Sequence, residues 1–185
     1  MELTAAVVDE KVRAYPDFQP LSAVEEDHVE MLPDVFARGD YSPRDAEWVV
    51  RWYFRRYLGA YPDAERRATE STYGENDFEA VRAVIGATID AGDPGSKLDH
   101  LTSLAGVDVP VGSAFLQFLD PDRYIVLGER EWTVLGRTGA VDEEYPDSPT
   151  IPQYVRYLES CRSVAEDCDC TLWELYQTLW LLGTE

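Results

Sequence analysis

Apolar side chains in this sequence recur mostly three or four residues apart, which is the spacing of amphipathic helices. Residues 42–59 show it most clearly, because their Ser-Pro start is typical of a helix N-cap and first turn. The inward face of this helix is predicted to carry Trp48, Val49, Trp52 and Tyr53. The arginines beside them are expected to be more exposed: Arg51, Arg55 and Arg56.

The same spacing predicts further helices along the chain. Three of them are expected to begin after the N-caps Asn76 and Ser96 and at Pro110. Others are expected over residues 129–135, 151–167 and 171–182. The helix after Asn76 is predicted to turn these residues inward: Phe78, Val81, Val84, Ile85 and Ile89. Residues 136–150 are polar and rich in Pro and Gly, which predicts a surface loop. Only RYIVLG, at 123–128, resembles a short strand.

This pattern predicts an all-α fold, a two-lobed helical domain of about eight helices that spans residues 1–185. The length and the 45% apolar content are sufficient for a full hydrophobic core. Within residues 1–40 the helical pattern is interrupted by Pro16, Pro20 and Pro33, so no helix boundaries are predicted there.

Acidic residues dominate the charge: 36 Asp and Glu against 16 Lys and Arg give a formal net charge of −20. They are spread along the whole chain, and lysine is scarce, a composition that resembles proteins of salt-accumulating archaea. Such a chain repels itself at low ionic strength, and salt removes that penalty. Because salt also screens phosphate and weakens counterion release, the charge neither supports nor excludes a nucleic-acid partner.

No apolar run is long enough to span a bilayer, and the acidic N-terminus lacks the basic start of a signal peptide. A soluble cytoplasmic protein without membrane contact is therefore expected. The three thiols, Cys161, Cys168 and Cys170, are odd in number and lack a fourth ligand. They are expected to be buried or half-exposed thiols rather than a disulfide framework or a metal site, and no cofactor is predicted.

Residues 97–119 form the most distinctive motif, in which helices at 97–105 and 110–119 are predicted to pair across a tight turn. The run LAGVDVPVGSAFLQFLDPDRYIVLGEREWTVL, which starts at Leu104, resembles the core of the helix–hairpin–helix DNA glycosylase superfamily. With the earlier WVVRWYFRR and the C-terminal L-x-E-L-x-x-x-L-W, the resemblance covers residues 42–182. It is greater to a little-characterised, acidic branch of haloarchaeal type, and it implies the fold of these DNA-repair proteins.

The resemblance also implies that the hairpin directs backbone N–H groups at a DNA phosphate. The residues that would form this contact lie in the turn and at the start of the second helix: Gly106, Val107, Asp108, Val109, Gly112 and Ser113. Asp108 stands where the family has a second glycine. Its side chain is predicted to cap the helix that starts at Pro110, which uses the same N–H groups that a phosphate would need.

The residues at the family's catalytic positions are different here. Bifunctional glycosylases carry a nucleophilic lysine at the position of Pro110, and proline cannot form a Schiff base. Gly128 stands at the position of the catalytic aspartate and offers no carboxylate. Glu129 is a candidate substitute, although it lies about 100° further round a helix. Glu129 and Glu131 are otherwise expected to form an acidic first turn of a helix.

Three functions remain open at this point. The first is a DNA-associated protein that keeps the glycosylase fold and the hairpin but has lost base excision. The second is an unconventional glycosylase that uses Glu129. The third is a non-catalytic helical domain for protein interaction, since a fold alone does not determine function. A cationic cleft beside residues 104–113 would favour the first.

Overall fold

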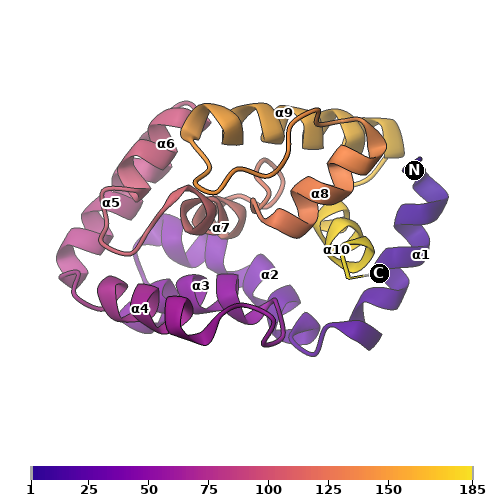
Figure 1. The fold of residues 1–185 in the computed structure, drawn as a ribbon. Helices are drawn as coiled ribbons and strands as arrows, with labels where there is room; N and C mark the ends of the chain where they lie inside the picture. The colour runs from indigo at the N-terminus through magenta and orange to yellow at the C-terminus, as the bar shows by residue number, and fades with distance from the viewer. Residues whose placement is uncertain (1, 185) are drawn as a thin grey trace.

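A computed structural model describes residues 2–184, and every regular element within them is an α-helix. Figure 1 shows the helices with their labels. Their bounds are α1 (Ala5–Phe18), α2 (Ser22–Arg38), α3 (Pro43–Arg55), α4 (Asp63–Tyr73), α5 (Phe78–Asp90), α6 (Pro94–Leu101), α7 (Val109–Leu119), α8 (Glu129–Thr138), α9 (Ile151–Cys168) and α10 (Leu172–Leu182). The all-α prediction is confirmed, with ten helices in the described residues.

Two largely apolar helices form the centre of the fold and are buried on all sides. Every residue of α7 except Leu119 is buried, and so is every residue of α10 except Glu174. Figure 1 shows α7 between α2, α3 and α4 on one side and α6, α8 and α9 on the other. A helix that is hydrophobic all round requires this kind of enclosure.

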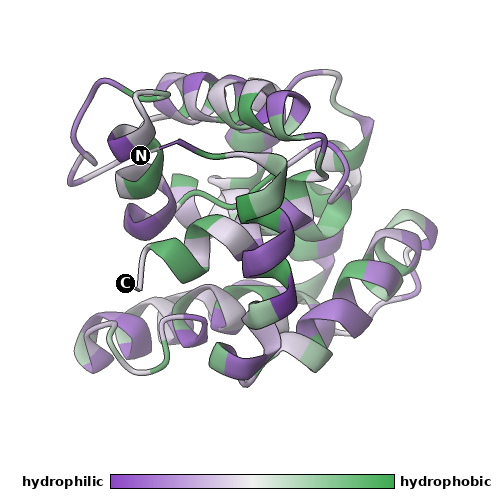
Figure 2. Cartoon of the chain, turned by 90° about the vertical axis from the view of Figure 1, so that its right-hand side faces the viewer, coloured by the Kyte–Doolittle hydropathy of each residue, from purple (hydrophilic) through white to green (hydrophobic). Residues whose placement is uncertain are grey.

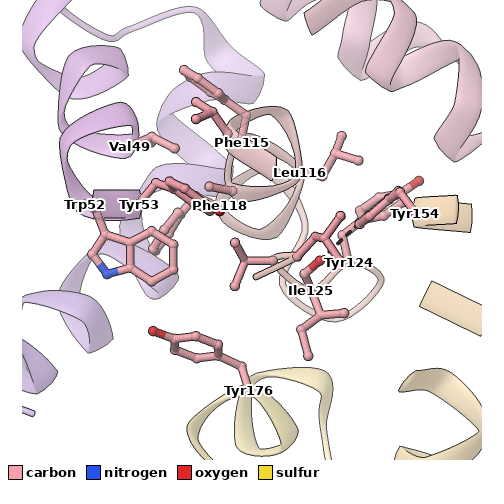
Figure 3. Packing of buried hydrophobic residues seen from close by; sticks show 14 of the residues in the cluster. Val49, Trp52, Tyr53, Phe115, Leu116, Phe118, Tyr124, Ile125, Tyr154 and Tyr176 are labelled. Atoms are coloured by element: carbon pink, nitrogen blue, oxygen red, sulfur yellow. Dashed lines mark hydrogen bonds between the residues drawn. The ribbon is translucent and has the colours of Figure 1, made fainter. Parts of the chain in front are cut away.

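Aromatic rings connect α7 to the helices around it (Figure 3). Phe118 of α7 packs edge-to-face on Trp52 of α3, with ring centroids 4.7 Å apart. Tyr176 of α10 lies 5.6 Å from the same Trp52 ring. Val49, Trp52 and Tyr53 are buried as predicted, whereas Trp48 is only partly buried. The early helix therefore contributes to the core through the face that its sequence predicts.

Residues 124–128 connect α7 to α8 as buried extended backbone rather than as a strand. Side chains of α7 replace the partners that a sheet would supply. The N–H of Val126 donates to Gln117 Oε1 and the N–H of Leu127 donates to Ser113 Oγ, each over 2.8 Å. Buried backbone groups need such partners. The strand-like pattern of this run thus reflects its complete burial.

The first two helices form although Pro16 lies inside α1 and Pro33 inside α2. Buried contacts hold both helices in place. The phenol of Tyr15 donates to the carboxylate of Glu25 over 2.8 Å, and Trp52 Nε1 donates to the same carboxylate over 2.7 Å. Such tertiary contacts outweigh the local cost of a helical proline, which is why the sequence pattern placed no helix here.

Two predicted helix starts are wrong by a few residues. Asp77, not Asn76, caps α5, because its carboxylate accepts the first free N–H groups of that helix. Asp93, not Ser96, caps α6, and a proline follows it at the first helical position. In both places two candidate cap residues stand close together in the sequence, and the helix uses the aspartate.

Other local differences follow from weak periodicity. The sequence pattern did not predict α4, whose only buried residue is Tyr73, because a polar helix shows little apolar spacing. Ile89 is exposed, and Thr88 takes the inward position on α5. The helix α8 continues to Thr138, so the loop before α9 begins later than residue 136.

The outer helices bury one face and expose the other, which Figure 2 shows as green and purple bands that alternate along their ribbons. None of the helices in residues 2–184 combines the length and the apolar character that a membrane span requires.

Candidate functional site

The turn between α6 and α7 is held in place by close contact with the end of α4. Gly106 adopts a φ of +73°, in the left-handed region that favours glycine. A Cβ atom at Gly106 would lie 2.7 Å from the backbone N of Tyr73 and 2.8 Å from the carbonyl O of Thr69. Only glycine therefore fits at this position, because other residues rarely adopt these dihedral angles and because a Cβ atom would clash with the backbone of α4.

Asn76 fixes the same turn through two hydrogen bonds. Its Nδ2 donates to the carbonyl of Ala105 over 2.9 Å, and its Oδ1 accepts the N–H of Ala105 over 3.0 Å. The side chain that the sequence suggested as a helix cap thus connects the α4–α5 loop to the hairpin. The hairpin turn is pre-organised by residues that precede it by about thirty positions.

Asp108 is the N-cap of α7, and its Oδ1 accepts the N–H of Val111 over 2.9 Å. The predicted cap is confirmed. The side chain remains reachable from solvent, but protein surrounds it closely enough that desolvation raises the pKa of this carboxyl above its ordinary value, against the effect of the cap.

The residues predicted to contact DNA differ in their accessibility. Gly106 is half-buried and Asp108 is exposed. The others are buried: Val107, Val109, Gly112 and Ser113. The hydroxyl of Ser113 is engaged within the core, and Gly112 allows close helix packing, because a Cβ atom there would lie 2.9 Å from Leu98 Cδ2. A surface contact of the hairpin is thus limited to its turn.

A pocket of about 660 Å³ opens beside the hairpin, between the end of α3 and the start of α8. Asp108 and Pro110 form its hairpin wall, and Glu129 and Arg130 form its α8 wall. Its volume lies within the range of about 300–1,000 Å³ that is typical of small-molecule sites. The structure therefore brings Pro110 and Glu129, which are nineteen residues apart in the sequence, to one cavity.

Four tyrosines line this pocket: Tyr53, Tyr57, Tyr61 and Tyr145. The rings of Tyr57 and Tyr61 lie 5.6 Å apart between centroids, and those of Tyr53 and Tyr57 lie 6.1 Å apart. Burial raises the pKa of all four phenols, so they are uncharged hydroxyls at neutral pH. The helical pattern does not single out this set, because Tyr57 and Tyr61 follow the end of α3 and only Tyr53 lies within it.

Charged groups around the pocket are mostly acidic. Four carboxylates line it, from Glu65, Asp108, Glu129 and Asp147, against the guanidinium groups of Arg130 and Arg137. The guanidinium of Arg130 lies over two aromatic rings, 4.9 Å from the centre of Tyr57 and 5.5 Å from that of Trp180. The cavity beside the hairpin is thus acidic rather than the cationic cleft that would attract phosphate.

Gly128 is buried at the start of α8, where it is the N-cap residue. A Cβ atom at Gly128 would overlap the guanidinium of Arg56 and the carboxylate of Glu131, and it would lie 2.7 Å from the phenol oxygen of Tyr57. No side chain fits on residue 128 unless these groups move. The position that the resemblance assigns to the catalytic aspartate therefore has no room for one.

Arg56 and Glu131 form an ion pair whose side chains are both fully buried. The expectation that Arg56 is more exposed is wrong, whereas Glu129 and Glu131 do form the expected acidic first turn of a helix, although Glu131 is buried within it. The guanidinium carbon also lies 4.6 Å from the ring centre of Tyr57 and 5.0 Å from that of Tyr53. Burial alone lowers the pKa of Arg56, but the carboxylate of Glu131 and the neighbouring tyrosines together outweigh this effect and raise it, so the guanidinium stays charged.

Comparisons with known proteins identify the fold. The crystal structure of the 8-oxoguanine DNA glycosylase of Thermotoga maritima is similar over 96% of this chain and 95% of that chain, with a TM-score of 0.58. The fold is that of a helical DNA glycosylase. The two sequences are 15% identical, so this similarity describes the fold alone. No protein-family model matches the sequence, and no curated protein matches it significantly.

In this glycosylase fold, the loop from α3 to α4 exposes an apolar side chain beside the pocket. Leu58 is 48% exposed, and its φ of +53° lies in a region that residues other than glycine seldom adopt. Its neighbours Tyr57 and Tyr61 belong to the pocket wall. The sequence analysis missed Leu58, although an apolar residue directly before Gly59 in a turn is a recognisable signal.

The thiols lie outside the tyrosine pocket. Cys161 and Cys168 are buried and Cys170 is half-buried, as expected, and burial raises the pKa of the Cys170 thiol to about 12. A thiol with such a pKa is protonated at neutral pH and is a poor nucleophile or metal ligand in that state.

Proposed function

We propose that this protein binds DNA by holding an unstacked base in the tyrosine pocket, with the hairpin turn against the backbone, and that it does not cleave the glycosidic bond. The observation that carries the proposal is the position of the pocket, which opens directly beside Asp108 and Pro110 of the hairpin. Stacking of a base on aromatic rings contributes about 1–3 kcal/mol and suits any base, because every base has a π-face.

The absence of excision is inferred from the residues at the pocket wall. Pro110 has no side-chain amine to form a Schiff base. A carboxylate on residue 128 would overlap Arg56 and Glu131. The carboxylate of Glu131 is itself bound by Arg56 and fully buried, so it does not reach a ligand in the pocket.

Affinity is expected to come from stacking and apolar contact more than from phosphate charge. The net charge of −20 and the acidic pocket oppose a phosphate backbone at low salt. At high salt, with a Debye length of about 3 Å at 1 M, that opposition is screened. Leu58 adds an exposed apolar side chain that can contact the bases next to the bound one.

Fluorescence anisotropy of labelled DNA in about 1 M KCl tests the proposal. Single strands, and duplexes with a mismatch, are expected to bind more tightly than an intact duplex, because their bases are already easier to unstack. Tyr61→Ala should weaken binding by about 1–3 kcal/mol. Leu58→Ser, as a separate variant, should also weaken binding, because it removes the apolar contact to the neighbouring bases. Phe18→Ala is a matched control, since Phe18 is 60% exposed and lies outside the pocket.

The proposal is contradicted if intact duplex binds as tightly as single strands, or if Tyr61→Ala and Phe18→Ala behave alike. No binding of any DNA over the whole range of salt would favour a domain for protein interaction instead. Both Tyr61 and Phe18 lie at helix ends or loops, so their removal leaves the central helices α7 and α10 intact.

A second candidate function rests on Glu129, which is exposed and lines the pocket. A carboxylate there is close enough to the ligand space to act as a base or to stabilise positive charge on a sugar. The test is strand cleavage at damaged bases after alkali treatment. Excision by the wild-type protein that Glu129→Gln abolishes would establish a glycosylase and replace the proposal of binding alone.

A further inference from the structure

Carboxylates outnumber guanidinium groups four to two in the lining of the tyrosine pocket. Its four carboxylates can only accept hydrogen bonds when they are ionised. On the donor side, Arg137 already donates to the carbonyl of Leu182 over 3.4 Å, and the guanidinium of Arg130 is stacked on Tyr57 and Trp180 with its Nη1 free of a hydrogen-bond partner among the described residues. The tyrosine hydroxyls can both donate and accept. The fixed charges of the pocket thus favour a ligand that donates.

The acceptors also come from two different parts of the pocket lining. Asp108 belongs to the hairpin wall, and Glu129 belongs to the wall formed by α8. The rings of Tyr57 and Tyr61 lie on the side of the α3–α4 loop. A flat base stacked on these rings would therefore meet a carboxylate at its edge, where exocyclic groups project.

Resting on the proposed function, we propose that the pocket selects bases that carry an exocyclic amino group over thymine and uracil. An amino group donates to a carboxylate, as in the pairing of Asp or Glu with the N4 amino group of cytosine. Thymine and uracil present carbonyl oxygens at the same edge, and these repel a carboxylate. The inference concerns Asp108 and Glu129 of this chain, and it adds base selection to a pocket whose stacking surface is indifferent to the base.

Cytosine and thymine are the decisive pair, because both are pyrimidines and differ little in stacking area. We would measure the anisotropy of short labelled strands of dC and of dT at mildly alkaline pH in about 1 M KCl. The wild-type protein is expected to prefer the dC strand by about fivefold or more. In the variant that combines Asp108→Asn with Glu129→Gln, the preference should fall towards equal affinity.

The double variant keeps the fold, because Asn caps a helix about as well as Asp does and Glu129 is exposed. The control combines Glu159→Gln with Glu166→Gln, an equal loss of charge at two exposed positions of α9 outside the pocket, and it should retain the preference. Equal binding of dC and dT by the wild type, or an unchanged preference in the double variant, would overturn the inference while leaving DNA binding in place. Absence of binding to either strand would overturn the proposed function and this inference together.

Discussion

The carboxylate of Glu131 binds the guanidinium of Arg56 directly beside the backbone of Gly128, and both side chains are fully buried. The pair joins the end of α3 to the first turn of α8, the two helices that also contribute Tyr53 and Glu129 to the pocket. It occupies the space that a side chain on residue 128 would need. A glycine at residue 128 thus leaves room for this buried ion pair.

Removing one partner of this pair should be strongly destabilising. Glu131→Gln leaves the guanidinium of Arg56 buried without its counter-charge, and we expect a loss of about 3–5 kcal/mol in the free energy of unfolding. Glu129→Gln, two residues earlier and exposed, should change it by less than about 0.5 kcal/mol. Denaturant unfolding of both variants in the same KCl buffer measures the difference. Similar losses for the two variants would contradict a structural role of the pair.

An aspartate placed at residue 128 should not create catalysis. Gly128→Asp places a second carboxylate where Arg56 and Glu131 already meet, so we expect no base excision and a destabilised protein. Gly128→Ala separates volume from charge, and its overpacking should cost about 1–3 kcal/mol. Strand-cleavage assays and unfolding curves test the two parts. Excision by Gly128→Asp would show that the pocket retains the rest of a catalytic site.

Gly106 and Gly139 provide a matched pair for the hairpin turn. Both have a positive φ, +73° and +82°. A Cβ atom at Gly106 meets backbone atoms of α4, whereas at Gly139 nothing lies within 4 Å. Gly139→Ala should therefore cost about 1–2 kcal/mol for its dihedral angles alone, and Gly106→Ala should cost about 1–3 kcal/mol more for the clash. Equal melting temperatures of the two variants would show that the hairpin is free to move away from α4.

Periodicity predicted most of this fold because the central helices are apolar over their whole length. The cores of α3, α7 and α10 are recognisable from such runs. Periodicity failed where tertiary contacts determine whether a helix forms. Pro16 and Pro33 are tolerated in helices because Tyr15, Glu25 and Trp52 hold them, and nothing local in the sequence indicates that contact.

The candidate site was predictable only in part for a similar reason. The cap at Asp108 is local, within three residues, and the sequence pattern found it. The burial of Arg56 depends on Glu131, which is 75 residues away, and a single sequence gives no sign of such a pair. The pocket itself arises from α3, α4, the hairpin and α8 together, so its tyrosines look like core residues when each segment is read alone.

The net charge of −20 makes stability depend on salt. Repulsion among like charges should weaken as KCl rises, and screening is nearly complete at about 1 M, where the Debye length is about 3 Å. We expect the melting temperature to rise steeply up to that concentration and to level off above it. Thermal unfolding by circular dichroism at a series of KCl concentrations measures this. A melting temperature that does not move with KCl would contradict salt adaptation.

Asp108 should give the stability of the fold a measurable pH dependence. Desolvation raises the pKa of its carboxyl above the ordinary value of 3.8, so the folded state binds this proton more tightly than the unfolded state does. The contribution of Asp108 to stability is therefore fully present below its ordinary pKa and falls as the pH rises through the raised value. Asp108→Asn keeps the cap of α7 but cannot titrate.

We accordingly expect Asp108→Asn to gain stability relative to the wild type as the pH rises through this window, and to keep a constant advantage above it. Asp108→Ala also removes the titration, but it loses the hydrogen bond to the N–H of Val111 and should be about 1 kcal/mol less stable than Asp108→Asn at every pH. Unfolding free energies of the three proteins, measured from mildly acidic to neutral pH at constant KCl, separate the two effects. A difference between wild type and Asp108→Asn that stays constant with pH would show that water reaches this carboxylate freely, and the acidic wall of the pocket would then discriminate weakly between ligands.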